Sequence, residues 1–173
     1  MIIKRATEAG EFFQIHQLNY KTFVEEIPQH QQNTEKILVD KFHNKNQYIV
    51  AKRNDKLIGM VCYNLQRPFS LDEKISNLNN YLPEFTNLAE IRLLSVIPEE
   101  RNTKVVYRLF KYVATEFDRL KIDTAIISGT TRQLRLYTHL GFKPFGSLVG
   151  KPGALYQPMY VTIKKVSYDF KNS

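Results

Sequence analysis

Two charged residues lie on one face of an otherwise apolar predicted strand, Leu88–Ile97. Glu90 and Arg92 are two positions apart, and side chains at that spacing in a strand point to the same face. A charge on a buried face is costly unless it is paired or used. A carboxylate placed there can remove a proton from a substrate or bind its amine. It can equally form a structural ion pair with Arg92, and the spacing alone leaves both interpretations open.

The same strand contains a predicted β-bulge. Its apolar residues alternate at Ala89, Ile91 and Leu93, and then the phase slips by one position and resumes at Leu94 and Val96. A one-residue slip is the sequence sign of an inserted residue, and bulges often redirect backbone groups beside active sites. The strand therefore predicts a local irregularity next to the two charges.

A helix with a basic stripe is predicted after this strand, from the residues that follow Pro98-Glu-Glu to Leu120. Cations at the start of a helix are mildly unfavourable, and a bound anion would reverse that effect. The pattern predicts an anion-binding site or a solvated basic face. The basic stripe consists of Arg101, Lys104, Arg108 and Lys111, and the buried stripe of Val106, Leu109, Phe110, Val113, Phe117 and Leu120.

Composition limits the function classes. The chain of 173 residues is long enough for one domain with a core, and residues 1–173 are predicted to form a single domain. No apolar run reaches the ~20 residues that span a bilayer. The single cysteine, Cys62, fits a reducing cytoplasm. The net charge of +8 comes from scattered Lys and Arg without a nucleic-acid-binding signature, so nucleic acid is not the expected partner. The four histidines lack metal-ligand spacing, and no metal is expected.

The order of elements predicts a mixed α/β domain. The segment 66–87 is a long polar excursion with a possible short helix at 71–82, and such excursions are usually functional. Thr7 and Thr34 are the expected caps of two early helices, which end before Pro28 and at Phe42. The expected strands cover 2–6, 47–53, 57–64, 88–97, 124–128, 142–145 and 155–164, and a further helix covers 130–140.

Two motifs in the second half resemble the GNAT acyltransferase family. Val96–Arg101 resembles the entry to the family's pyrophosphate-binding motif, and Leu136–Phe142 resembles its Tyr-x-x-x-Gly-Phe signature. The resemblance implies a sheet of six to seven mixed strands with a bulged fourth strand and flanking helices. The chain departs from the family at Lys104 and Val106, which occupy glycine-like positions where backbone N–H groups would close on coenzyme A.

The first half resembles a narrower group, the acyl-homoserine-lactone synthases and long-chain N-acyl amino acid synthases. Tyr20–Glu26 is similar to their Arg/Tyr-x-x-Val-Phe-x-x-Glu segment, and Asp40–His43 to the acidic-aromatic step into their first hairpin. Glu90-Ile-Arg92 resembles their Glu-x-x-Arg strand, with a spacing one residue shorter. Members of this group use fatty acyl thioesters, often on an acidic acyl carrier protein. The resemblance therefore accounts for a pyrophosphate loop without glycines.

The resemblance implies direct acyl transfer and a role for each candidate residue. Glu90 is expected to act as general base, directly or through water. Tyr137 is expected to act as general acid toward the leaving thiolate, although simple packing against the Gly141-Phe142 turn explains it equally well. Glu25, Glu26 and Arg92 are expected to bind the amine-bearing acceptor, although a solvated helix end explains the two glutamates equally well. Residues expected to bind the donor are Leu94, Val96, Arg101, Asn102, Thr103, Lys104, Val105, Val106 and Arg108.

The sequence thus predicts a cytoplasmic N-acyltransferase. Its co-substrate is expected to be acyl-coenzyme A or an acyl carrier protein thioester, its acceptor a small amine such as an amino acid, and acyl carrier protein a candidate partner. An ordinary acetyl-coenzyme A N-acetyltransferase is the alternative within enzymes. A non-catalytic module that binds a carrier protein or an acyl ligand is the alternative from another class. The sequence does not predict an oligomeric state.

Overall fold

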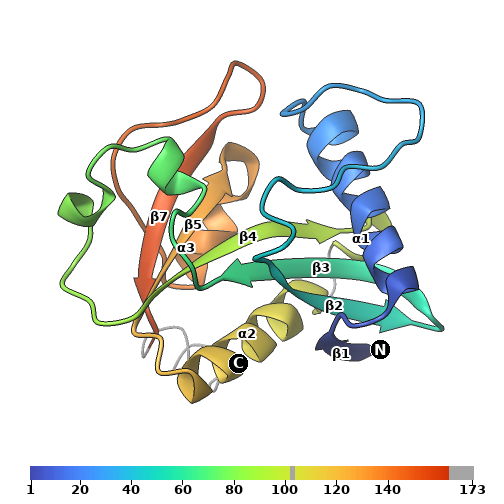
Figure 1. The fold of residues 1–173 in the computed structure, drawn as a ribbon, viewed down its shortest axis with the longest axis horizontal. Coiled ribbons are helices and arrows are strands. Elements are labelled where there is room, and N and C mark those ends of the chain that lie inside the picture. The colour runs from blue at the N-terminus through green and yellow to red at the C-terminus, as the bar shows by residue number, and fades with distance from the viewer. Residues whose placement is uncertain (102–103, 164–173) are drawn as a thin grey trace. The chain divides into compact units, whose positions relative to one another are not determined.

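The computed structural model describes residues 1–101 and 104–163 and has a mixed α/β architecture (Figure 1). Seven strands follow the order β1-β2-β3-β4-β5-β7-β6, and β4 and β5 pair in parallel. The predicted mixed sheet of six to seven strands with flanking helices is confirmed. The chain groups into two compact units, 1–63 with 93–113 and 64–92 with the residues from 114 onward. The single domain over 1–173 stays a prediction.

The first unit is an antiparallel three-strand layer with one helix packed on it. β1 (Ile2–Arg5), β2 (Gln47–Arg53) and β3 (Lys56–Asn64) pair in sequence order. The β2–β3 turn is tight because Asn54 and Asp55 both adopt positive φ, 49° and 61°, as two-residue hairpin turns require.

Helix α1 (Ala9–Tyr20) covers the core of this unit. Its Ile15 and Leu18 join buried residues of β2 and β3, among them Tyr48 and Cys62, in one apolar cluster. A π-helical segment, Lys21–Glu26, continues α1. Cys62 is fully buried in this cluster.

The second unit is built on a strand that enters from the centre of the chain. The first half of β4 (Leu88–Val96) pairs with β5 (Thr124–Thr130), with Glu90 opposite Ile126. Beyond β5 lies β7 (Tyr156–Thr162), which is antiparallel to β5, and then the short β6 (Lys143–Pro144), which is antiparallel to β7. Helix α3 (Leu134–His139) follows β5 and ends before Gly141, whose φ of 98° suits a helix C-terminus.

The predicted helix over Thr34–Phe42 is wrong. This segment has no helical turn before residue 41, because its backbone groups bond to α1 instead of to one another. The Tyr20 hydroxyl contacts both backbone groups of Asn33 at 3.2 Å, and the Leu38 N–H donates to the His16 carbonyl. Tertiary contacts therefore override the local capping signal.

Two further boundaries also differ from the prediction. The excursion 66–87 contains two 3-10 turns, Leu71–Glu73 and Leu78–Tyr81, in place of one helix. The first helix is capped by Glu8, and not by Thr7, because the Glu11 carboxylate accepts the N–H groups of both residues at 3.1 Å.

Helix α2 (Val105–Arg119) is strongly amphipathic, as predicted, but its buried stripe begins one residue early. Val105 is fully buried, whereas Val106 is half-buried. The reason is Gly59 of β3: a Cβ there would lie 2.9 Å from Val105 Cγ1, so the missing side chain makes room for this valine. Among the described residues, no helix has the length and apolar character needed to cross a membrane.

Candidate active site

Glu90 is a completely buried carboxylate of the second unit. It lies on β4 between the buried Ala89 and Ile91, and its exposed fraction is 0 %. β4 is held in place at this point by its parallel partner β5. A charge in this environment requires several donors, because desolvation strongly disfavours the ionised form.

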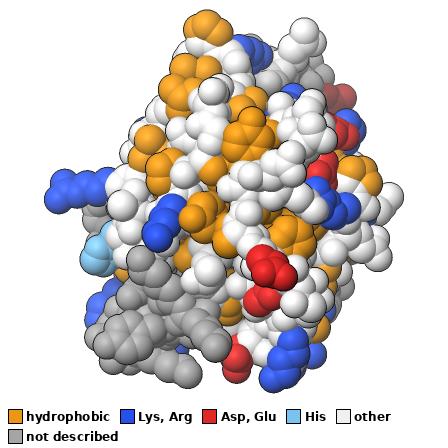
Figure 2. All heavy atoms as spheres, turned by 90° about the vertical axis from the view of Figure 1, so that its left-hand side faces the viewer, with side chains coloured by type: hydrophobic (Ala, Val, Ile, Leu, Met, Phe, Trp, Pro, Cys, Tyr) orange, Lys and Arg blue, Asp and Glu red, His pale blue; other side chains and the backbone are white. Residues whose placement is uncertain are grey.

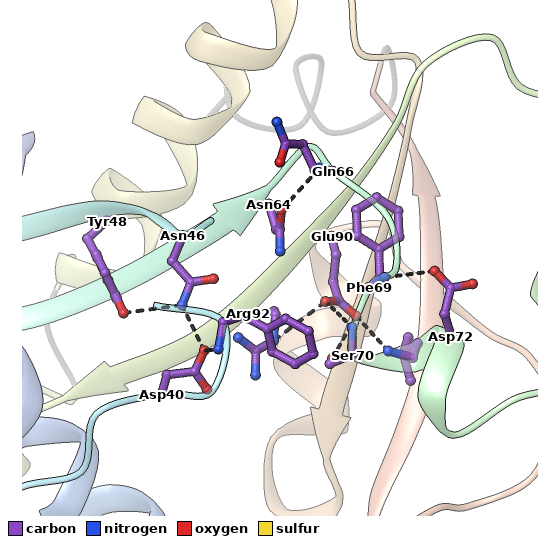
Figure 3. Close-up of polar contacts among 12 residues, drawn as sticks. Asp40, Asn46, Tyr48, Asn64, Gln66, Phe69, Ser70, Asp72, Glu90 and Arg92 are labelled. Carbon is purple, nitrogen blue, oxygen red and sulfur yellow. Dashed lines mark hydrogen bonds and ion pairs between the residues drawn. The ribbon is translucent and has the colours of Figure 1, made fainter. Parts of the chain in front are cut away.

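The donors come from the excursion, at Ser70 (Figure 3) and at the next residue, Leu71. The Ser70 N–H donates to Glu90 Oε1 at 3.0 Å and its hydroxyl donates to Oε2 at 2.8 Å. The Leu71 N–H donates to Oε2 at 3.1 Å. Both carboxylate oxygens are therefore held by one segment that is about 20 residues distant in sequence.

Arg92 pairs with the same carboxylate, as the strand spacing suggested. Its Nε lies 3.5 Å from Glu90 Oε1, and the two side chains are 14 % and 0 % exposed. Burial raises the pKa of Glu90 above its usual value, and the Arg92 charge and the bonds from Ser70 and Leu71 lower it only in part. Glu90 is thus a carboxylate with an increased affinity for a proton, which is the property of a general base working near neutral pH.

The segment that carries Ser70 is itself tightly organised. The Arg67 guanidinium forms two bonds to the Asp72 carboxylate, at 3.1 and 2.6 Å. Asp72 also accepts the Phe69 N–H at 2.7 Å, and the Phe69 ring is fully buried. The sequence indicated that this excursion is functional but did not identify Ser70. The opposite charges of Arg67 and Asp72, five residues apart, were the available sign that the segment around Ser70 is ordered.

Tyr137, the predicted general acid, is buried on α3. Its exposed fraction is 3 %, and its hydroxyl donates to Gln133 Oε1 at 3.2 Å. Burial raises the pKa of Tyr137, so its proton is retained at physiological pH. Gly129 of β5 makes room for the ring, since a Cβ there would lie 2.9 Å from Tyr137 Cδ2.

Tyr156 of β7 is a second tyrosine in this unit that the sequence did not single out. It packs against the apolar cluster that contains Leu71. Burial and the Glu90 charge raise the pKa of Tyr156, and the Arg92 charge lowers it. Tyr156 is therefore electrostatically coupled to both charged residues of β4, which a pattern within one strand cannot reveal.

In the first unit, two residues predicted to contact different substrates are paired with each other. Arg101 Nη2 lies 2.6 Å from both Glu26 oxygens, and Arg101 Nε donates to the Val96 carbonyl at 3.0 Å. Glu26 was expected to bind the acceptor and Arg101 the donor. In this arrangement the charges of Arg101 and Glu26 compensate each other. The pair connects the residues before α2 to the end of the π-helical segment.

The remaining donor-site predictions lie around the start of α2. The side chains of Lys104 and Arg108 are exposed, and neither forms an ion pair with a described residue. Leu94 and Val96 are buried on β4, and Glu25 is exposed. Asn102 and Thr103 lie outside the described residues.

The predicted irregularity of β4 occurs at Leu93. Its φ is 59°, in the left-handed region, at the position where the apolar alternation slips. A leucine in this conformation costs about 1–2 kcal/mol, and such residues gather at functional sites. Within residues 1–101 and 104–163, no group of three or more His, Cys, Asp or Glu side chains is placed to hold a metal ion.

Comparison with known proteins gives one family and several structures of the same fold. Residues 12–142 match the acetyltransferase (GNAT) family. The acyl-homoserine lactone synthase LasI superposes with a TM-score of 0.80 at 12 % identity, covering 99 % of this chain and 95 % of LasI. No curated protein matches the chain by sequence.

Two further structures of this fold are similar. BjaI, a CoA-dependent acyl-homoserine lactone synthase solved with SAM and isopentyl-CoA, gives a TM-score of 0.74 at 17 % identity, covering 93 % of this chain and 81 % of BjaI. FeeM, an N-acyl amino acid synthase from uncultured soil microbes, gives 0.75 at 15 % identity, covering 98 % and 99 %. At these identities the likeness establishes the fold.

Proposed function

This chain belongs to the acetyltransferase (GNAT) family, and from that premise we propose that it transfers an acyl group from a thioester to the amine of a small molecule. The observation that carries the proposal is Glu90, a fully buried carboxylate with a raised pKa on the central strand of the fold. Perturbed carboxylates of this kind concentrate at functional sites.

The proposed chemistry is one displacement at the thioester carbonyl. The acceptor amine attacks the carbonyl carbon, and Glu90 takes the proton that the nitrogen loses. The thiolate leaves, and Tyr137, which is protonated before this step, is the proposed donor of its proton. Arg92 fixes the orientation of Glu90 and provides positive charge for an acceptor that carries a carboxylate, such as an amino acid.

The donor is proposed to be an acyl thioester on coenzyme A or on an acyl carrier protein. Lys104 and Arg108 supply exposed positive charge for either one. Lys104 replaces the glycine that lets a backbone close on pyrophosphate, and this favours the carrier protein, which is acidic. The names of LasI, BjaI and FeeM support an acceptor that carries an amino acid group.

Two other functions have an observation in their favour. The matched family is named for acetyl transfer, which favours acetyl-coenzyme A as donor. The engagement of both Glu90 oxygens by Ser70 and Leu71 favours a non-catalytic module, in which Glu90 only fastens the excursion to β4.

One donor-by-acceptor experiment separates these functions. The protein is incubated with acetyl-CoA, dodecanoyl-CoA and dodecanoyl-carrier protein, each with amino acids or SAM. Thiol release and the product mass are then measured. We expect N-acyl product from the long-chain donors, with higher kcat/KM for the carrier protein. Product only from acetyl-CoA would establish the acetyltransferase, and no product from any pair would contradict acyl transfer.

A further inference from the structure

The proposed base has no direct route to a substrate in this structure. Glu90 is 0 % exposed, and its oxygens contact Ser70, Leu71 and Arg92. A general base must lie within hydrogen-bond reach of the proton that it removes, directly or through one intermediary. Proton transfer to Glu90 therefore requires an intermediary group, and the donors around its carboxylate are the candidates for it.

Among these donors only the Ser70 hydroxyl can both give and accept a proton. The Ser70 and Leu71 N–H groups and the Arg92 guanidinium donate but do not accept. The hydroxyl lies 2.8 Å from Glu90 Oε2, the shortest of the four contacts. Ser70 is half-buried, whereas Glu90 is fully buried. Of these two hydrogen-bonded residues, Ser70 is therefore the one with solvent exposure.

The position of this hydroxyl is fixed by its own segment. The Ser70 N–H is bound to Glu90 Oε1 at 3.0 Å, so backbone and side chain of one residue contact both carboxylate oxygens. On either side, the buried Phe69 and the Arg67–Asp72 pair hold the chain. A hydroxyl held by its neighbours loses little entropy when it orients for transfer.

We propose that Ser70 is a further catalytic residue, whose hydroxyl relays the proton of the acceptor amine to the buried Glu90 carboxylate. This inference rests on the proposed acyl transfer. As the N–C bond forms, the nitrogen gives its proton to Ser70 Oγ, and the Ser70 hydroxyl proton passes to Glu90 Oε2. The C–S bond of the thioester then breaks and the thiolate leaves. Ser70 ends as it began, Glu90 becomes neutral, and the nitrogen becomes an amide. The raised pKa of Glu90 supports the direction of transfer.

The experiment compares Ser70→Ala with Ser70→Thr, which restores a hydroxyl, and with Ser76→Ala, an exposed serine of the same excursion. We expect Ser70→Ala to lower kcat by roughly 10²-fold, Ser70→Thr to recover most of it, and Ser76→Ala to match the parent. Because the two groups act as one unit, Ser70→Ala/Glu90→Gln should be no slower than Glu90→Gln alone. Thermal unfolding of each variant monitors the fold.

The pH dependence tests the hydrogen bond from Ser70 to the base, and the solvent isotope effect tests the relay itself. The Ser70 hydroxyl bond lowers the pKa of Glu90, so its removal should move the acid limb of the kcat profile to higher pH. The parent should show two protons in flight in a solvent-isotope inventory and Ser70→Ala fewer. A Ser70→Ala variant with parent kcat and an unmoved acid limb overturns the relay, while acyl transfer stands. A parent protein inactive with every donor overturns both.

Discussion

Two buried glutamates, one in each unit, have opposite electrostatic settings. Glu11 at the start of α1 is 2 % exposed and has two lysine partners, Lys4 at 3.0 Å and Lys52 at 3.2 Å. Glu90 is 0 % exposed and has one ion-pair partner within residues 1–101 and 104–163, Arg92 at 3.5 Å. Each also accepts backbone N–H groups. Burial by itself therefore does not decide what a carboxylate does.

The difference appears in the affinity of each group for a proton. Burial acts to raise the pKa of Glu11, but the bonds from Thr7, Lys4, Glu8 and Lys52 outweigh it and bring the pKa to about 2. For Glu90 burial prevails and the pKa rises. The first carboxylate stays ionised and serves the fold, whereas the second can take a proton and is suited to catalysis.

The sharpest way to break this comparison is Glu90→Gln. If Glu90 is the base, the amide cannot take a proton, and kcat should fall by roughly 10²-fold or more. Steady-state kinetics with the donor that gives most product measures the effect, and circular dichroism monitors folding. A variant that loses stability but keeps its kcat would assign Glu90 to the fold, as with Glu11.

Glu11→Gln tests the other half of the comparison. We expect a loss of roughly 3 kcal/mol in the free energy of unfolding at pH 7, because two lysines lose their partner. The loss should be smaller at low pH. The folded pKa of about 2 lies below the unfolded value of 4.5, so the stabilisation is complete above 4.5 and disappears as pH falls toward 2. Urea unfolding between pH 2 and 7 measures it, with the exposed Glu8→Gln as control.

Reversing Lys104 and Arg108 to Glu extends the comparison to exposed charge. Lys104 lies immediately before α2 and Arg108 lies on it, and both side chains are exposed, so the fold should be unaffected. Donor binding should weaken at low salt by about tenfold. The loss should shrink as ionic strength rises, because screening weakens the parent's attraction as well. If the reversed variant keeps the parent's KM for the donor at both 20 and 300 mM salt, these two cations only contact solvent and do not bind the donor.

Tyr137→Phe should have the smallest effect. A thiolate leaves without full protonation, and the Tyr137 hydroxyl is bonded to Gln133 in a buried position. We expect a fall in kcat of less than about tenfold. A fall as large as that of Glu90→Gln would show that leaving-group protonation is as important as amine deprotonation.

Local patterns in the sequence predicted much of the fold. Strand alternation located β2, β3 and β4 closely, and the slip at Leu93 predicted the place of the left-handed residue. The amphipathic period located α2 to within a few residues. These features depend on neighbours along the chain, which the sequence displays directly. The helix predicted after Thr34 failed because that segment bonds to α1.

For the site, the sequence determined which residue types lie on one face, and the tertiary structure decided their partners. Strand spacing placed Glu90 beside Arg92. It could not show that Ser70 and Leu71 return to that carboxylate, or that Arg101 pairs with Glu26 across 75 positions. Such contacts form when segments that are distant in the sequence come together in the fold, and the local periodicity of a strand or helix carries no information about them. For the same reason, the opposite pKa shifts of the buried Glu11 and Glu90 could be recognised only from their partners in the folded chain.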